Sequence, residues 1–403
     1  MDTGSPPGRG GRVEVRALEG LRLVSALLIV FFHCQLVARP VRGPGPPGTW
    51  AARSGYLAVD FLFVLSGFAQ FLPLAASGPD RLPSWSGYAL RRVARIVPAY
   101  WLACGATVLF VGSVTWGAGH AGRTVGVWEA LLHLTFAHHI VYGISGQVGF
   151  GPNTALWTMT AEALLYVTLP FVARAFLRHP GVALLCGLAV AVSWRVVTVL
   201  IPGDLAYSIH LVSQYPAFAF HFALGMAAAI VVVRLREEPG LTELSPTALA
   251  SCAFGAALWG IVALAAWMRA ADPRLAGFDQ QSGYYIRWMW NLFPASAFAI
   301  VCVGVALAPP RVVAPLTNRV VRWLGEASYG VYLIHILVML EIDRYWISHG
   351  HQHHLALWQI GTATAAVALV IGRLSFWIVE EPARRLARRH RPGLVESQAA
   401  RRI

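Results

Sequence analysis

The sequence predicts an all-α membrane protein, a polytopic helical bundle with about ten transmembrane helices. Of its 403 residues, 57% are hydrophobic and only 13% are charged, whereas soluble globular proteins carry roughly 25% charged residues. The apolar residues are gathered in runs of about 20, the length that a helix needs to cross the hydrocarbon core of a bilayer. Both observations exclude an ordinary soluble domain and favour a chain folded within a membrane.

Ten apolar runs are long enough to span a bilayer. In chain order they lie at about residues 18–38, 56–76, 96–116, 155–176, 181–201, 212–233, 246–268, 288–308, 325–342 and 356–379. A further apolar segment at 128–142 is shorter and carries Glu129, His133, His138 and His139. Its length and polarity are typical of a re-entrant or interfacial helix rather than an eleventh span.

The two ends of the chain differ from the apolar middle. Residues 1–16 have the composition of a disordered tail, and residues 383–403 form a basic tail, so we expect one transmembrane domain at 17–382. The first apolar run is too long for the hydrophobic region of a signal peptide and has no small-residue cleavage site. We therefore interpret it as a retained first span.

The arginines predict how the bundle is oriented. All 32 basic residues are arginine, and with 19 acids the formal charge is +13. A basic total can indicate nucleic-acid binding, but the runs leave no soluble domain for it, so we expect no nucleic-acid partner. If the N-terminus is cytoplasmic, 22 arginines fall in inner segments and 8 in outer ones. The positive-inside rule then favours both termini in the cytoplasm. The Ala-, Gly- and Arg-rich composition suggests a GC-rich bacterium, and thus a bacterial cell membrane.

The first run contains two polar residues whose spacing places them on one face of a helix. Arg22 and His33 are eleven positions apart, so in a helix they share a face to within roughly 20° and are separated by about 16 Å. Arg22 then lies near the cytoplasmic boundary and His33 near the midplane, where ionisable groups are costly. A neutral imidazole at that depth can act as a general base. It can equally form a hydrogen bond to a neighbouring helix, and the spacing does not choose between these roles.

A second midplane histidine is His335, in the sequence S-Y-G-V-Y-L-I-H. Ser328, Tyr329 and Tyr332 precede it by one to two helical turns. On its own, such a Ser/Tyr/His face is more often packing between helices than a catalytic group.

Glu162 lies within the fourth predicted span, where an unpaired carboxylate is costly. It must either pair with a cation or stay protonated as an acid. Asp60, Ser66, Arg195 and His221 are the polar residues of other spans that could meet it. The sequence does not choose among them.

Three arginines, Arg91, Arg92 and Arg95, lie between the second and third runs. Arg92 and Arg95 share a helical face, and guanidinium groups suit phosphate oxygens. Ordinary flanking charge is the alternative. A loose histidine cluster between the last two runs has no recognisable metal-ligand spacing, and the five cysteines are isolated, so we expect no metal site and no disulfide.

Six short motifs occur along the chain in a fixed order, and together they resemble those of the integral-membrane acyltransferase-3 family over nearly the whole length. They are Arg22 with His33; V-D-F-L-F-V-L-S-G-F, with Asp60 and Ser66; Arg92 and Arg95 before I-V-P-A-Y; L-W-T-M-T-A-E, with Trp157 and Glu162; Ser328, Tyr329, Tyr332 and His335; and Glu380 with Pro382. The chain departs from the family pattern at Glu19, where Asp is usual, and at Leu62, Thr158 and Met159.

The resemblance implies a ten-helix enzyme that transfers an acyl group, often acetyl, from cytoplasmic acyl-CoA to a hydroxyl group. Family acceptors include polysaccharide, peptidoglycan, lipid-linked sugars and small metabolites such as macrolide antibiotics, and for this chain small-metabolite tailoring is our first interpretation. Acyl-CoA is a co-substrate, and no permanently bound cofactor is implied. A polytopic transporter without acyl-transfer chemistry is the alternative from another functional class.

The resemblance also implies roles for individual residues. Arg22, Arg92 and Arg95 would bind the phosphates of acyl-CoA, and His33 would deprotonate the acceptor. Glu162 would orient or polarise the histidine or the acceptor, and His335 would donate to the same site. An acyl-histidine relay is a second possible route.

Overall fold

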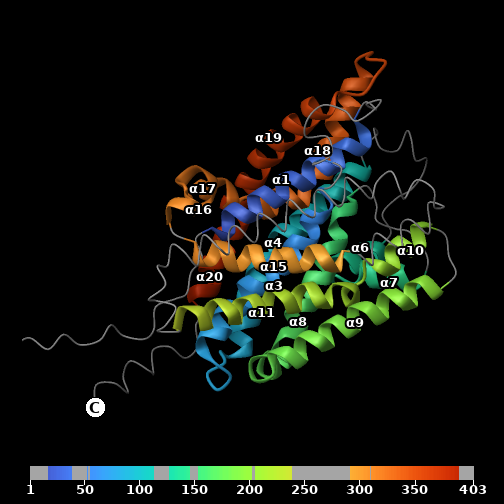
Figure 1. The fold of residues 1–403 in the computed structure, drawn as a ribbon. Helices are drawn as coiled ribbons and strands as arrows, with labels where there is room; N and C mark the ends of the chain where they lie inside the picture. The colour runs from blue at the N-terminus through green and yellow to red at the C-terminus, as the bar shows by residue number, and fades with distance from the viewer. Residues whose placement is uncertain are drawn as a thin grey trace, which may run out of the picture.

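The computed structural model describes residues 17–38, 52, 55–112, 127–145, 153–201, 205–237, 291–308 and 310–389, and within these residues every regular element is helical (Figure 1). Among these described residues, seven helical segments are long and apolar enough to cross a membrane, or up to nine if each of two bent pairs is one span. The prediction of an all-α, polytopic membrane bundle is confirmed. The predicted span at 246–268 lies outside the described residues, so the count of ten and the orientation stay predictions.

Most membrane-spanning segments coincide with the predicted runs. They are α1 (Leu18–Val37), α3 (Leu57–Ser77), α4 (Trp85–Gly112), η1 (Thr154–Leu156) with α8 (Trp157–Arg178), α9 (Pro180–Leu200), η2 (Tyr215–Phe218) with α11 (Ala219–Glu237), and α19 (Leu357–Ser375) with η4 (Phe376–Glu380) and α20 (Glu381–Arg389). The bent pairs are α15 (Leu292–Leu307) with α16 (Pro310–Thr317) and α17 (Arg319–Glu326) with α18 (Ser328–Ser348).

The segment at 128–142 forms two short helices, α6 (Val127–Leu134) and α7 (His138–Ser145). They are separated at Phe136, which has a positive φ of 61°, a conformation that breaks a right-handed helix. A third short helix, α10 (Leu205–Val212), packs beside α7. Neither α6 nor α7 is long enough to cross a bilayer.

Glycines allow the central helices to pack closely. A Cβ atom built on Gly67 of α3 would lie 2.4 Å from the carbonyl oxygen of Phe222, and one on Gly225 of α11 would lie 2.0 Å from that of Val64. Small residues of this kind let transmembrane backbones approach one another. Helix α3 is therefore held against α11 in the middle of the bundle, with α1, α18 and α19 along one side (Figure 1).

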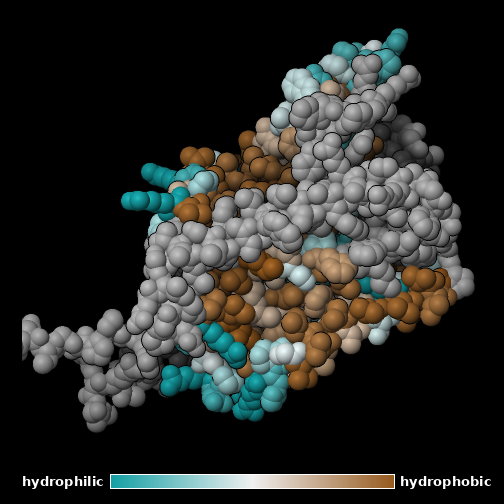
Figure 2. All heavy atoms as spheres, viewed as in Figure 1, coloured by the Kyte–Doolittle hydropathy of each residue, from teal (hydrophilic) through white to brown (hydrophobic). Residues whose placement is uncertain are grey.

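The surface is apolar where lipid would contact it. Large side chains such as Phe171, Leu185 and Val370 are more than 60% exposed. Figure 2 shows hydrophobic surface between more hydrophilic ends of the molecule. Because lipid tails are as apolar as these side chains, this exposure fits a protein whose outer face lies in a bilayer.

Candidate active site

Helices α1 and α18 bring two histidines together that are 302 positions apart in the chain. The Nε2 atom of His335 lies 3.1 Å from the Nδ1 atom of His33, and the ring centroids are 4.9 Å apart. His335 is fully buried, whereas His33 is partly exposed. His33 therefore makes an interhelical hydrogen bond, and its partner is the other histidine predicted to belong to the site.

The backbone around the pair determines which ring nitrogens carry protons. The Nδ1 atom of His335 lies 2.7 Å from the carbonyl oxygen of Tyr332, and that of His33 lies 3.0 Å from the carbonyl oxygen of Ile29. A carbonyl oxygen only accepts, so each neutral ring is protonated at Nδ1. The Nε2 atom of His335 then accepts from His33 Nδ1–H. This network leaves the Nε2 atom of His33 without a proton, which is the state a general base requires.

The other motif residues of α18 hold this helix in place. The hydroxyl of Tyr332 donates to the carbonyl oxygen of Ala155 at 3.1 Å and lies 2.8 Å from the hydroxyl of Thr158. The hydroxyl of Tyr329 donates to the carbonyl oxygen of Ile96 at 3.0 Å. Ser328, the first residue of α18, is buried. The tyrosines thus tie α18 to α4 and to the start of α8, and His335 faces His33 as a result.

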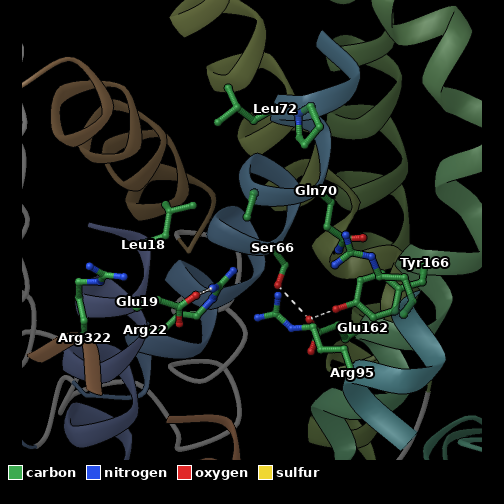
Figure 3. Close-up of a pocket in the computed structure, with 13 residues that line it drawn as sticks. Leu18, Glu19, Arg22, Ser66, Gln70, Leu72, Arg95, Glu162, Tyr166 and Arg322 are labelled. Carbon is green, nitrogen blue, oxygen red and sulfur yellow. Dashed lines mark hydrogen bonds and ion pairs between the residues drawn. The ribbon is translucent and has the colours of Figure 1, made fainter. Parts of the chain in front are cut away.

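A separate pocket contains the predicted phosphate-binding arginines (Figure 3). Its volume is about 260 Å³. The residues that line it are Leu18, Glu19, Arg22, Ser66, Ala69, Gln70, Leu72, Pro73, Arg92, Arg95, Glu162, Tyr166 and Arg322. Four arginines against two glutamates give the pocket an excess of positive charge, which favours an anionic ligand.

Each motif arginine is held differently in this pocket. The Nη1 atom of Arg22 forms an ion pair of 2.6 Å with Glu19, one turn earlier in α1. The guanidinium of Arg92 lies over the rings of Tyr88 and Tyr166, with its carbon 5.3 and 5.6 Å from the two centroids. Arg95 lines the pocket one turn further along α4. Cation–π contacts of this kind leave the planar edge of the Arg92 guanidinium available to an anion.

Glu162 lies in the arginine pocket and accepts hydrogen bonds from two hydroxyls. Ser66 donates at 3.1 Å, and Tyr166 donates from one helical turn away. Of the four candidate partners, Ser66 is the one that meets it. Within the described residues no hydrogen bond joins Glu162 to either His33 or His335.

The remaining candidate partners of Glu162 lie elsewhere in the bundle. The Oδ1 atom of Asp60 is 2.8 Å from Nε2 of His221, and both side chains are buried. The guanidinium of Arg195 donates to the carbonyl oxygen of Ala217 at 2.9 Å. In the interior, the first contact joins α3 to α11 and the second joins α9 to η2. Trp157 packs on Phe63 and Phe218.

The histidines of α6 and α7 form a distinct buried group. The rings of His133 and His138 stack with centroids 4.2 Å apart, and Tyr100 donates to the carbonyl oxygen of His133 at 2.9 Å. Burial lowers the pKa of His139 to about 3, and its Nε2 atom lies 3.0 Å from the hydroxyl of Ser213. These rings are packed among helices, and none of them lines the arginine pocket.

Three polar residues that line the pocket were not identified as site residues from the sequence, namely Gln70, Tyr166 and Arg322. Tyr88, whose ring contacts Arg92, was not identified either. Two of the lining residues carry a spacing signal, since Tyr166 follows Glu162 by four positions and Gln70 follows Ser66 by four, which places each pair on one helical face. Arg322 resembles ordinary flanking charge, and nothing in the sequence distinguishes it.

Nearly the whole chain matches one known protein family. Residues 15–379 match a family model described as an acyltransferase domain. The chain belongs to the acyltransferase-3 family. The resemblance inferred from the six motifs is confirmed, and the match extends over the helices that carry both the histidine pair and the pocket.

Relatives of two lengths are similar to this acyltransferase-family chain. It is 27% identical to acyltransferase MdmB of Streptomyces mycarofaciens, with 94% of each chain covered, and 24% identical to nodulation protein 10 of Rhizobium leguminosarum bv. viciae, with 91% of this chain and 92% of the relative covered. It is 21% identical to peptidoglycan O-acetyltransferase OatA of Listeria monocytogenes, of which it spans only 57%, and it spans 55% of YrhL from Bacillus subtilis. No solved structure matches the chain at a significant level.

Proposed function

We propose that the protein is a bacterial cell-membrane O-acyltransferase that moves an acyl group, such as acetyl, from cytoplasmic acyl-CoA to a hydroxyl of a carbohydrate or small-metabolite acceptor. The observation that carries this proposal is the His33–His335 pair, in which His33 presents an unprotonated Nε2 atom. Family membership and the basic pocket support it.

The pocket and the histidine pair are separated by a distance that suits acyl-CoA. Arg22 and His33 are eleven residues apart on α1, which corresponds to about 16 Å along the helix axis. The pantetheine arm contains about as many chain bonds as four residues and so reaches roughly 14 Å when extended. Phosphates bound near Arg22, Arg92 and Arg95 would therefore leave the thioester close to His33.

In the proposed reaction His33 acts as the general base. Its Nε2 atom takes the proton of the acceptor hydroxyl as the hydroxyl oxygen attacks the thioester carbonyl. The carbon–sulfur bond then breaks, the ester product forms, and the leaving thiolate receives the proton from His33. His335 accepts a hydrogen bond from His33 Nδ1–H throughout, so it stabilises the imidazolium that forms between these two proton transfers.

Glu162 is assigned a positioning role. It is fixed by Ser66 and Tyr166 within a group of arginines, so its carboxylate partly balances their charge and restricts where they point. This proposed role differs from the expectation that Glu162 orients or polarises the histidine or the acceptor, and its support is that Glu162 lines the pocket and bonds Ser66 and Tyr166.

The decisive experiment compares His33→Ala with wild type in isolated membranes that contain labelled acetyl-CoA and candidate acceptors. We expect His33→Ala to abolish acceptor labelling while the protein level in the membrane is unchanged. His179→Ala, which removes an exposed histidine between α8 and α9, is the matched control and should keep full activity. Full activity of His33→Ala would refute the assigned base. Uptake of an acceptor without consumption of thioester would instead support a transporter.

The same labelling separates direct transfer from an acyl-histidine relay. Direct transfer leaves no label on the protein, whereas a relay leaves acid-labile label on wild-type protein incubated without acceptor. We expect the direct route, since the unprotonated Nε2 of His33 is available as a base. Acceptor-independent labelling that disappears in His33→Ala would establish the relay.

A further inference from the structure

Gln70 is a buried residue of the arginine pocket that no motif explains. Its side chain is only 5% exposed, and it lines the pocket from α3. The amide oxygen accepts a hydrogen bond of 2.7 Å from the hydroxyl of Tyr88. Its amide nitrogen, in contrast, has no hydrogen-bond partner among the described residues. Buried donors without an acceptor are rare and usually indicate a missing partner.

Tyr88 determines how this amide is presented. Because its hydroxyl donates to the oxygen of Gln70, the amide is fixed with its NH₂ group away from Tyr88. The same tyrosine ring lies against the guanidinium of Arg92, whose buried Nε–H also lacks a partner in this part of the structure. Two donors without partners, the neutral amide of Gln70 and the charged guanidinium of Arg92, thus lie next to Tyr88. A ligand with several acceptor oxygens could accept hydrogen bonds from both donors, and phosphate is such a ligand.

The Gln70–Tyr88 contact lies at the end of the pocket farther from His33. Tyr56 immediately precedes α3, and its ring lies 5.8 Å from that of Phe32, the neighbour of His33 in α1. Helix α3 therefore begins beside His33. Gln70 follows Ser66 in this helix by one turn, or about 6 Å. In α4, Tyr88 precedes Arg92 by a similar distance. Tyr88 also packs in the same apolar cluster as Ala17, at the beginning of α1.

We propose that Gln70, oriented by Tyr88, is a further donor-binding residue that hydrogen-bonds the 3′-phosphate of CoA. This inference rests on the proposed function. With the thioester near His33, the diphosphate follows the pantetheine arm and reaches the arginines first. The ribose and its 3′-phosphate come next, at the end of the pocket where the unsatisfied amide of Gln70 lies.

The test measures binding of CoA and of dephospho-CoA, which lacks only the 3′-phosphate, to the purified full-length protein in detergent by calorimetry. Gln70→Met removes the donors at similar volume, and Gln70→Glu replaces them with acceptors. We expect each variant to raise the Kd for CoA about tenfold, as for a lost hydrogen bond to a charged group, and to leave the Kd for dephospho-CoA unchanged. Tyr88→Phe should shift the Kd for CoA in the same direction by a smaller factor.

The matched control is Gln359→Met, which changes an exposed glutamine in the first turn of α19 and should alter neither Kd. If Gln70→Met misfolds in a thermal-unfolding check, Gln70→Glu and Tyr88→Phe provide the same comparison. Equal losses for both ligands, or no loss for CoA, would overturn the assignment while the proposed function stands. If the wild-type protein bound neither ligand, the proposed function would fail, and this inference with it.

Discussion

At the scale of single residues, the two histidines act as one unit. The Nδ1–H group of His33 is shared between a backbone carbonyl oxygen and the Nε2 atom of His335. His335 is fixed in turn by the carbonyl oxygen of Tyr332. Removing His335 would therefore free the ring of His33 to rotate and to exchange its tautomer, although His335 need not touch the substrate.

We expect His335→Leu to reduce kcat roughly 10²-fold, within the range of general acid–base contributions, with little change in the KM for acyl-CoA. His335→Gln should retain more activity, because its amide oxygen can still accept from His33 Nδ1–H. Initial-rate kinetics in membranes measure both variants. Equal losses for Leu and Gln would contradict a role that depends on the hydrogen bond.

Arg95 should act on donor binding rather than on chemistry. It lines the pocket, and charge-assisted hydrogen bonds to phosphate are worth about 1.5–3 kcal/mol. Arg95→Gln is thus expected to raise the KM for acyl-CoA tenfold or more while kcat stays within a factor of about two. Arg178→Gln, which removes an arginine in an exposed ion pair with Asp80, is the control. A fall in kcat with an unchanged KM would exclude phosphate binding by Arg95.

The sequence indicates candidate site residues more readily than it indicates which residues they contact. The helical period can relate Arg22 to His33 because both residues lie in one helix, α1. Periodicity says nothing about contacts between helices, so the meeting of His33 with His335, and of Glu162 with Ser66, emerged only from the packed bundle. Gln70 was missed because its environment, not its neighbours in the chain, makes it unusual.

At the scale of elements, hydropathy located the spans but not the helix ends. Helix α4 begins at Trp85, well before the apolar run predicted at 96–116, because backbone hydrogen bonds continue through the arginine-bearing turns. The segment at 128–142 divides into α6 and α7 at a residue with positive φ. Hydropathy reports what lipid accepts, whereas caps and local backbone geometry end a helix.

The contact between α3 and α11 should be sensitive to a single methyl group. A Cβ on Gly225 would lie 2.0 Å from the backbone oxygen of Val64 in α3. That oxygen can move away only if the helix backbone itself shifts. We expect Gly225→Ala to destabilise the protein by about 1–3 kcal/mol, measured as a lower Tm in detergent. Gly105→Ala in α4 is the matched control, because no atom lies within 4 Å of its added Cβ. A similar Tm for both variants would show that the two helices are not closely packed.

At the scale of the whole molecule, the charge distribution and the proposed chemistry both predict the same orientation in the membrane. The arginine pocket lies at the end of the bundle where α1 begins, and acyl-CoA is a cytoplasmic metabolite. The arginines of α20, at the end of the last helical segment, are predicted to lie on the cytoplasmic side as well. The positive-inside rule and donor access therefore both require this end to face the cytoplasm.

Cysteine labelling tests that orientation directly. In a variant whose five native cysteines are replaced by alanine, Ser77→Cys would report on the exposed end of α3, and Gln352→Cys on the exposed segment between α18 and α19. With a membrane-impermeant maleimide, we expect intact cells to label Gln352→Cys and to label Ser77→Cys only after permeabilisation. The cysteine-free protein is the control for background. The opposite pattern would place the arginine pocket outside the cell, where acyl-CoA is absent, and would rule out the proposed donor route.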